Sequence, residues 1–179
     1  MTGAVANYAE ALYSLAKEEA LAASILEELD ALDTAFVQEP DFLRLLATPS
    51  LSKDERFTII DDSFRGKVHP YVLNFMKILT GKGYVRHFGQ CCAAYRQRYN
   101  ADHGIISVLA VSAVALTDAQ REKLQRKLET VTGKTVQLQN RVDPACLGGV
   151  RLDYDGRRVD GTVMNRLESI RTMLKNTVL

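Results

Sequence analysis

The spacing of apolar residues changes once along the chain, near residues 102–104, and this change limits the folds available to it. Before that point, apolar residues recur every three or four positions, as in amphipathic helices. After it, segments that alternate like strands stand between helical stretches. A chain of 179 residues is long enough for two small domains. We therefore expect a helical domain over 1–104 and a mixed domain over 105–179.

The helical domain is predicted to be an antiparallel bundle of six short helices. Pro40 and Pro70 suit the first position of a helix, where the missing N–H would have no partner in any case. Ser52 and Glu55 have the spacing of a capping box, in which two side chains satisfy the first free amides of a helix. Gly81 and Gly83 are expected to end the fifth helix, because glycine tolerates the backbone conformation that terminates one.

The remaining residues predict a small α/β module in the order strand, helix, three strands, helix, so the fold class of the chain is α+β. The first strand is expected over Ile105–Ala115, which is apolar on both faces like a strand buried on both sides. Thr117 and Gln120 have capping-box spacing for the helix that follows. Further strands are expected at Val136–Val142, Leu147–Asp153 and Arg157–Val159. A final helix is expected to carry apolar residues at Val163, Leu167, Ile170 and Leu174.

The two halves differ in charge as well as in period. Residues 1–104 hold 11 basic and 14 acidic side chains and residues 105–179 hold 12 and 8, so the net charges are −3 and +4. A basic module suits either a charged protein partner or nucleic acid, although aromatic residues that stack on bases are sparse. The longest apolar run, Ile105–Leu116, is shorter than the roughly 20 residues of a membrane span, so no span is expected.

No motif in the sequence assembles a catalytic or cofactor site. Gly133-Lys134-Thr135 resembles the tail of a phosphate-binding loop, but a helix precedes it where a strand is required. His87 and Cys91 could supply half of a zinc site, and no second pair has suitable spacing. Cys91, Cys92 and Cys146 are interpreted as small buried side chains in a reducing compartment. We therefore expect a binding protein with no cofactor, no metal and no small-molecule substrate.

Several segments of the chain resemble a known family. Tyr8-Ala9-Glu10-Ala11-Leu12-Tyr13-Ser14-Leu15-Ala16 is similar to the opening helix of the δ subunit of F-type ATP synthase, the homologue of the mitochondrial oligomycin-sensitivity-conferring protein. The second half resembles the C-terminal signature of that family, in the same order, at Thr132-Gly133-Lys134, Val142-Asp143-Pro144, Leu147-Gly148-Gly149-Val150 and Asp160-Gly161-Thr162. The resemblance extends over essentially the whole chain, and its C-terminal part is the more specific.

The resemblance implies a stator subunit that is not an enzyme. In this family the helical domain binds the N-terminal helix of an α subunit on the α/β catalytic head, and the C-terminal module joins the head to the b subunits of the peripheral stalk. The head is thereby held against rotation, so that proton- or sodium-driven torque is used for ATP synthesis. By position, the groove for the α-subunit helix would be lined by Tyr8, Ala11, Leu12, Leu15, Phe75, Ile78 and Leu79. The signature positions of the stalk-binding module would be Asp143, Pro144, Gly148, Gly149, Asp160 and Gly161.

Three alternatives remain open at this point. A thiol or metal enzyme would require Cys91, Cys92 or Cys146 to be chemically necessary. Periodicity alone does not distinguish a helix-binding groove between the first and fifth helices from two helices that are simply central in the bundle. The basic second half also allows a free-standing nucleic-acid-binding or adaptor module. The resemblance favours the stator subunit. The N-terminal Met and the lack of a transit extension favour a peripheral protein on the cytoplasmic face of the bacterial plasma membrane.

Overall fold

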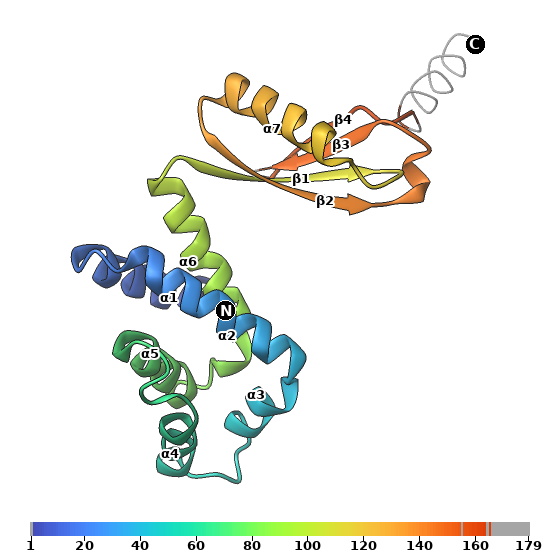
Figure 1. Cartoon of the computed structure of the whole chain (residues 1–179). Coiled ribbons are helices and arrows are strands. Elements are labelled where there is room, and N and C mark those ends of the chain that lie inside the picture. Colours follow the sequence, from blue (N-terminus) through green and yellow to red (C-terminus); the bar gives the residue numbers. More distant parts are fainter. Residues whose placement is uncertain (1, 155, 164, 166–179) are drawn as a thin grey trace, which may run out of the picture. The chain divides into compact units, whose positions relative to one another are not determined.

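The computed structural model describes residues 2–154, 156–163 and 165, which divide between Asn100 and Ala101 into two compact units (Figure 1). The helices up to residue 102 are α1 (Thr2–Glu18), α2 (Ala22–Gln38), α3 (Pro40–Leu46), α4 (Lys53–Phe64), α5 (Pro70–Gly81), the 3-10 turn η1 (Val85–His87) and α6 (Phe88–Asp102). The later elements are β1 (Ile105–Ser112), α7 (Asp118–Thr132), β2 (Thr135–Val142), the 3-10 turn η2 (Pro144–Cys146), β3 (Val150–Tyr154) and β4 (Arg157–Asp160). The predicted α+β class is confirmed.

The helices begin where local chemistry favours them. Pro70 occupies the first turn of α5, as its missing N–H requires. At the start of α4, the Glu55 amide donates to Ser52 Oγ at 3.2 Å and the Ser52 amide donates to the Glu55 carboxylate at 2.7 Å. This predicted capping box is confirmed, and the hydrogen bonds from Ser52 lower the pKa of Glu55. The same pair of hydrogen bonds joins Thr117 and Gln120 at the start of α7.

A continuous apolar cluster forms the core of the first unit. All of the helices α1–α6 contribute fully buried side chains to it. The rings of Phe36 and Phe88 meet edge to face with centroids 5.1 Å apart, and those of Tyr13 and Tyr95 do so at 5.3 Å. The buried Tyr95 hydroxyl donates to the carbonyl of Ala22 at 3.1 Å, so its polar end is satisfied. This core holds α1 and α5 in place.

The second unit is built on a four-stranded sheet with the order β2-β1-β3-β4. β1 is parallel to β2 and antiparallel to β3, and β3 and β4 form an antiparallel hairpin. α7 lies against one face of the sheet (Figure 1), where Leu128 packs on the buried side chains of Ile106, Val108 and Val136. The prediction that β1 is buried on both sides is wrong for its first half. Ser107 is exposed there because alternate residues point away from α7.

Two strand boundaries differ from the predicted ones by three residues each. β3 begins at Val150 rather than Leu147, because Leu147 and Gly149 have left-handed backbones with φ of 58° and 78°. β1 ends at Ser112 rather than Ala115, where the Ser112 hydroxyl donates to the carbonyl of Val114 at 2.7 Å and turns the chain. The predicted final helix falls largely outside the described residues, which exclude its apolar positions Leu167, Ile170 and Leu174.

Candidate partner-binding surfaces

The groove residues predicted on α1 fall into two groups. Leu12 is buried in the core, so it supports the helix rather than offering a surface. Ala11 and Leu15 are exposed, and Leu15 retains 41 % of its accessible area. Tyr8 is half-buried, with its ring centroid 6.0 Å from that of Tyr84. α1 therefore presents a ring, a small residue and a leucine on its accessible side.

The groove residues predicted on α5 divide in the same way. Phe75 and Leu79 are buried in the core of the first unit. Ile78 retains 47 % of its accessible area and opens onto a hollow of about 500 Å³ between α4 and α5. Of the seven predicted groove residues, Tyr8, Ala11, Leu15 and Ile78 thus have accessible surface, whereas the other three are packed beneath it.

Tyr84 contributes to this surface and was missed in the sequence. It follows α5 in a helix-ending motif: the Tyr84 amide donates to the carbonyl of Leu79 at 2.8 Å, and the Gly83 amide donates to that of Thr80 at 3.2 Å. Gly83 has the left-handed φ of 77° that this motif requires. The residue after such a glycine commonly makes an apolar contact with the helix it closes. The pair Gly83-Tyr84 was therefore a usable signal.

The six signature residues of the second unit meet at one corner, where the chain leaves β4. The Asp143 carboxylate accepts from the Ala145 amide at 3.1 Å, and Pro144 opens η2. The Asp160 carboxylate accepts from the amide and the hydroxyl of Thr162 at 2.9 and 2.7 Å, and these bonds lower its pKa. Two backbone hydrogen bonds join the segments before β3 and after β4: the Gly161 amide donates to the carbonyl of Val150 at 3.2 Å, and the Val163 amide donates to that of Gly148 at 3.0 Å.

Gly149 allows this corner to close. A Cβ atom at this position would lie 2.5 Å from the carbonyl oxygen of Gly161 and 3.0 Å from Thr162 Cα. The close approach joins the backbone before β3 to the backbone after β4, and φ of 78° also favours glycine. The signature positions are thus brought together to fix the direction in which the chain continues beyond β4.

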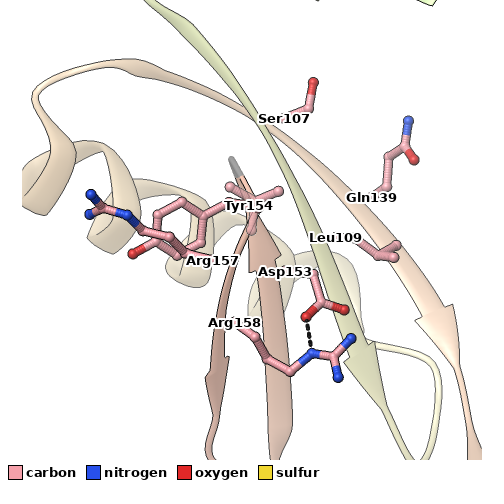
Figure 2. Close-up of a pocket in the computed structure, with 9 residues that line it drawn as sticks. Ser107, Leu109, Gln139, Asp153, Tyr154, Arg157 and Arg158 are labelled. Carbon is pink, nitrogen blue, oxygen red and sulfur yellow. Dashed lines mark hydrogen bonds and ion pairs between the residues drawn. The ribbon is translucent and has the colours of Figure 1, made fainter. Parts of the chain in front are cut away.

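A hollow of about 540 Å³ lies beside the β3–β4 hairpin (Figure 2). Leu109, Gln139 and Asp153 contribute to its lining, and Figure 2 shows Asp153 joined to Arg158. The Arg158 Nε donates to Asp153 Oδ1 at 2.7 Å, and Arg151 Nε lies 3.4 Å from Oδ2. These arginines hold the pKa of Asp153 below its usual range, with the Arg158 hydrogen bond the main cause. The hollow therefore has a charged lining.

The residues considered as candidates for catalysis, metal binding or phosphate binding occupy positions that the fold explains. Cys91 and Cys92 are buried on α6, and burial raises the pKa of Cys91 to about 11 and also raises that of Cys92, which keeps both thiols protonated. Cys146 is buried in η2. No group of three potential metal ligands occurs within residues 2–154, 156–163 and 165. Gly133 ends α7 with φ of 66° ahead of β2, as a helix stop does.

The helices in the described part of the chain are too short or too polar to cross a membrane. The fold and the exposed side chains define a class: an α+β protein in which a helical unit with accessible apolar residues on α1 and α5 precedes a sheet unit with a charged hollow.

Comparison with known proteins identifies the family. The family model described as ATP synthase delta (OSCP) subunit matches residues 5–174. ATP synthase subunit delta of Alkaliphilus oremlandii is 33 % identical over 97 % of this chain and 96 % of its own length. The corresponding protein of Clostridioides difficile is 30 % identical over 99 % of both chains. The chain belongs to the ATP synthase delta (OSCP) subunit family, which is a non-catalytic structural component of ATP synthase.

A solved structure shares the fold over almost its whole length. A chain of the Toxoplasma gondii mitochondrial ATP synthase hexamer superposes with a TM-score of 0.74, over 95 % of this chain and 96 % of that one, at 15 % identity. Family membership decides between the functions that the sequence left open: the chain is a stator subunit of ATP synthase rather than a free-standing nucleic-acid-binding module.

Proposed function

We propose that this chain joins the catalytic head of an F-type ATP synthase to the b subunits of its peripheral stalk, at the cytoplasmic face of the bacterial plasma membrane. The domain over 1–104 binds the N-terminal helix of an α subunit, and the domain over 105–179 binds the stalk. The head is held still while the rotor turns, so that proton- or sodium-driven rotation is coupled to ATP synthesis. The observation that carries this proposal is the set of accessible apolar side chains on α1 and α5, above a fully packed core.

The α1 surface has the composition that a helix-in-groove contact needs. Leu15 offers an exposed apolar side chain, and Tyr8 and Tyr84 offer large rings with polar ends. Ala11 lies one helical turn from Leu15 and is small, so the backbone of a bound helix has room to approach there. An amphipathic helix would bury its apolar stripe against these residues.

A rigid scaffold supports this surface. The proposal treats α1–α6 as one antiparallel bundle, whose shared core includes Leu12, Phe75 and Leu79 directly beneath the accessible residues. Close-packed interiors resist deformation, so a load applied to the bound helix passes into the bundle without extensive rearrangement. A subunit that resists torque requires this property.

Two features of the second unit support stalk binding. The corner built by Asp143, Gly149 and Asp160 fixes the path of the chain after β4 through backbone hydrogen bonds. The hairpin hollow presents Arg157 and Arg158 in a half of the chain whose net charge is +4. A basic surface of this kind favours an acidic protein partner.

The head contact is tested with Tyr8→Asp and Leu15→Asp, measured as binding of a synthetic peptide of the α-subunit N-terminal helix. Each change places a carboxylate where the peptide should bury apolar surface, so affinity should fall by about 100-fold. Val37→Asp is the matched control, because Val37 is 75 % exposed and belongs to α2 rather than to α1 or α5. Circular dichroism should stay at the level of the unmodified chain. Equal affinity for all three variants would overturn the assignment of α1.

The division of labour is tested in inverted membrane vesicles that lack the subunit. A chain shortened to residues 1–104 should still bind the head, since the first unit has its own core. It should leave ATP hydrolysis intact but fail to restore ATP-driven ion pumping, because an unheld head turns with its rotor. Pumping restored to the level given by the full chain would show that the second unit is not the stalk connection.

A further inference from the structure

The first turn of α5 is capped by a histidine side chain. His69 occupies the N-cap position, and its Nδ1 accepts a hydrogen bond from the Tyr71 amide at 3.2 Å. The first amides of a helix need acceptors of this kind, and Ser, Thr, Asp and Asn usually provide them. Pro70 has no amide hydrogen, so the Tyr71 amide is the first in α5 that requires a partner. The imidazole ring of His69 supplies it.

This cap requires the imidazole to be neutral. A protonated ring has an N–H donor at both nitrogens and has no acceptor to offer. Histidine is the side chain whose charge ordinarily changes between about pH 5 and 8. A positive charge is also unfavourable at a helix N-terminus, which is the positive end of the helix dipole. Uptake of a proton by His69 therefore removes the cap and adds repulsion in the same step.

A second partner for the ring, suited to its charged form, lies on α2. The backbone amide of His69 donates to Glu28 Oε2 at 2.7 Å, although 41 positions separate the two residues. This hydrogen bond holds a carboxylate next to His69, where an imidazolium can donate to it after the ring rotates. Both side chains are half-buried. The ring thus has two alternative partners, the Tyr71 amide when neutral and the Glu28 carboxylate when charged.

The other titratable and charged groups around His69 do not compete for the ring. From α5, the Tyr71 ring meets the imidazole edge to face with centroids 4.8 Å apart. From α4, the Asp61 carboxylate is already paired with Arg65 at 2.9 Å. Lys67, in the loop between α4 and α5, is exposed and has the same charge as the imidazolium. The carboxylate on α2 is therefore the group that favours the charged ring.

We propose that His69 is a pH-sensitive cap that connects the start of α5 to α2. The neutral ring holds the Tyr71 amide and fixes the first turn of α5. On acidification the imidazolium turns to Glu28, and the first turn of α5 is released. Because α5 carries Ile78, which the proposed function assigns to the head contact, binding of the head weakens as the pH falls. This last step rests on the proposed function, whereas the exchange of partners does not.

The test measures hydrogen exchange of the Tyr71 amide in the full chain from pH 8 to pH 5, corrected for the intrinsic exchange rate. Protection should fall by at least about fivefold, as expected from the loss of an N-cap. In His69→Asn it should stay within about twofold, because asparagine caps through Oδ1 and takes up no proton in this range. His103→Asn is the matched control at an exposed position after α6, and it should retain the fall.

A second variant tests the alternative partner. Glu28→Gln keeps an oxygen that accepts from the His69 amide but removes the negative charge, so the fall in protection should move to lower pH. No fall in the unmodified chain, or an equal fall in His69→Asn, overturns the inference. An unchanged profile in Glu28→Gln overturns the role of the carboxylate.

The link to the head is measured separately, as binding of the α-subunit helix peptide at pH 8 and pH 5.5. Weaker binding at pH 5.5 in the unmodified chain but not in His69→Asn supports the link, and an equal loss in both overturns it. If the unmodified chain does not bind the peptide at pH 8, the proposed function fails. The exchange measurement then still decides whether His69 is a pH-sensitive cap.

Discussion

Side chains from α1 to α6 meet in one apolar cluster in the first unit. In the described part of the second unit the apolar cluster is small: Ile106, Val108 and Val136 form it, and Ala110 and Val111 are also buried on β1. α7 contributes no fully buried residue and contacts the sheet through half-buried ones such as Leu128. The two units therefore differ in what determines their folds. The packing of the first unit depends mainly on buried apolar surface, whereas that of the second depends more on sheet register and on the close approach at Gly149.

The candidate partner-binding surfaces of the two units differ as well. A bundle with apolar residues beyond those needed for its core leaves some of them accessible, and Leu15 and Ile78 are such residues. The sheet unit also exposes apolar side chains, among them Val131 and Leu147, but its candidate hollow is charged and contains Asp153 and Arg158. In the proposed function the first unit binds an amphipathic helix and the second unit binds a charged partner surface.

The largest expected effect tests the role of backbone geometry in the second unit. Gly149→Ala should destabilise this unit by at least about 4 kcal/mol, since it adds a left-handed alanine and forces the Gly161 carbonyl to move. Gly133→Ala is the matched control, because φ is +66° but no atom lies within 4 Å of the added Cβ. It should cost about 1 kcal/mol. Hydrogen exchange resolved by residue measures both, and equal costs would contradict the account of the corner.

The next prediction compares the two cores with the same substitution. Ile25→Ala should lower the free energy of unfolding of the first unit by about 3–4 kcal/mol. Ile25 is completely buried in a large apolar cluster, so the substitution leaves a cavity there. Ile106→Ala should cost the second unit about 2–3 kcal/mol, because its smaller core relaxes around the gap. Urea unfolding of each unit measures this. A larger cost at Ile106 would reverse the comparison.

A smaller effect, of opposite sign, is expected at the two non-glycine residues with left-handed backbones. Ala20 follows α1 with φ of 57°, and Leu147 follows η2 with φ of 58°. Replacement of either by glycine removes the strain of the Cβ atom and should stabilise its unit by about 0.5–1 kcal/mol. Thermal unfolding checks this, with Ala6→Gly in the exposed interior of α1 as a control that should destabilise by about 1 kcal/mol. A loss of stability at Ala20 would contradict the assigned conformation.

The smallest effects concern the loss of stability at acidic pH. Lys77 lowers the pKa of Asp61 in the first unit, and Arg158 lowers that of Asp153 in the second. A carboxyl group whose pKa is lower in the folded than in the unfolded chain stabilises the folded state at any pH above its unfolded pKa. This contribution is lost as the pH falls below about 4. Asp61→Asn and Asp153→Asn should each flatten the acid dependence of their own unit. Unfolding measured from pH 7 to pH 2 tests this, and the exposed Asp62→Asn serves as the control.

Much of the fold was predictable because it depends on local chemistry. The capping boxes at Ser52 and Thr117 and the helix stop at Gly133 involve residues within four positions of one another, so their spacing in the sequence is sufficient. The alternation of Val136 and Leu138 likewise predicts β2. Local signals failed where long-range geometry decides, as at Leu147, whose left-handed backbone belongs to a corner closed by Gly161.

The sequence predicts which helices carry the candidate site, but not which of their residues are exposed. Helical spacing places Leu12 and Leu15 three positions apart, yet one is buried and the other accessible, and only the packing of the neighbouring helices decides which. Ile78 lines a hollow between α4 and α5, and its place in a groove with α1 stays a prediction. Tyr84 lies outside any regular helix, so a search of helix faces passed over it.

The central position of β1 in the sheet has a consequence for synthesis on the ribosome. Both neighbours of β1, β2 and β3, lie later in the chain, and Val108 pairs with Tyr154 across 46 positions. The first unit can complete its core before this partner emerges, at about 5–20 residues per second. During that interval the apolar run from Ile105 has two unsatisfied edges, which favour association with other chains. The growing chain then consists of a folded helical unit followed by an unpaired β1. Conditions that slow translation of residues 113–154 should therefore increase the need for chaperones.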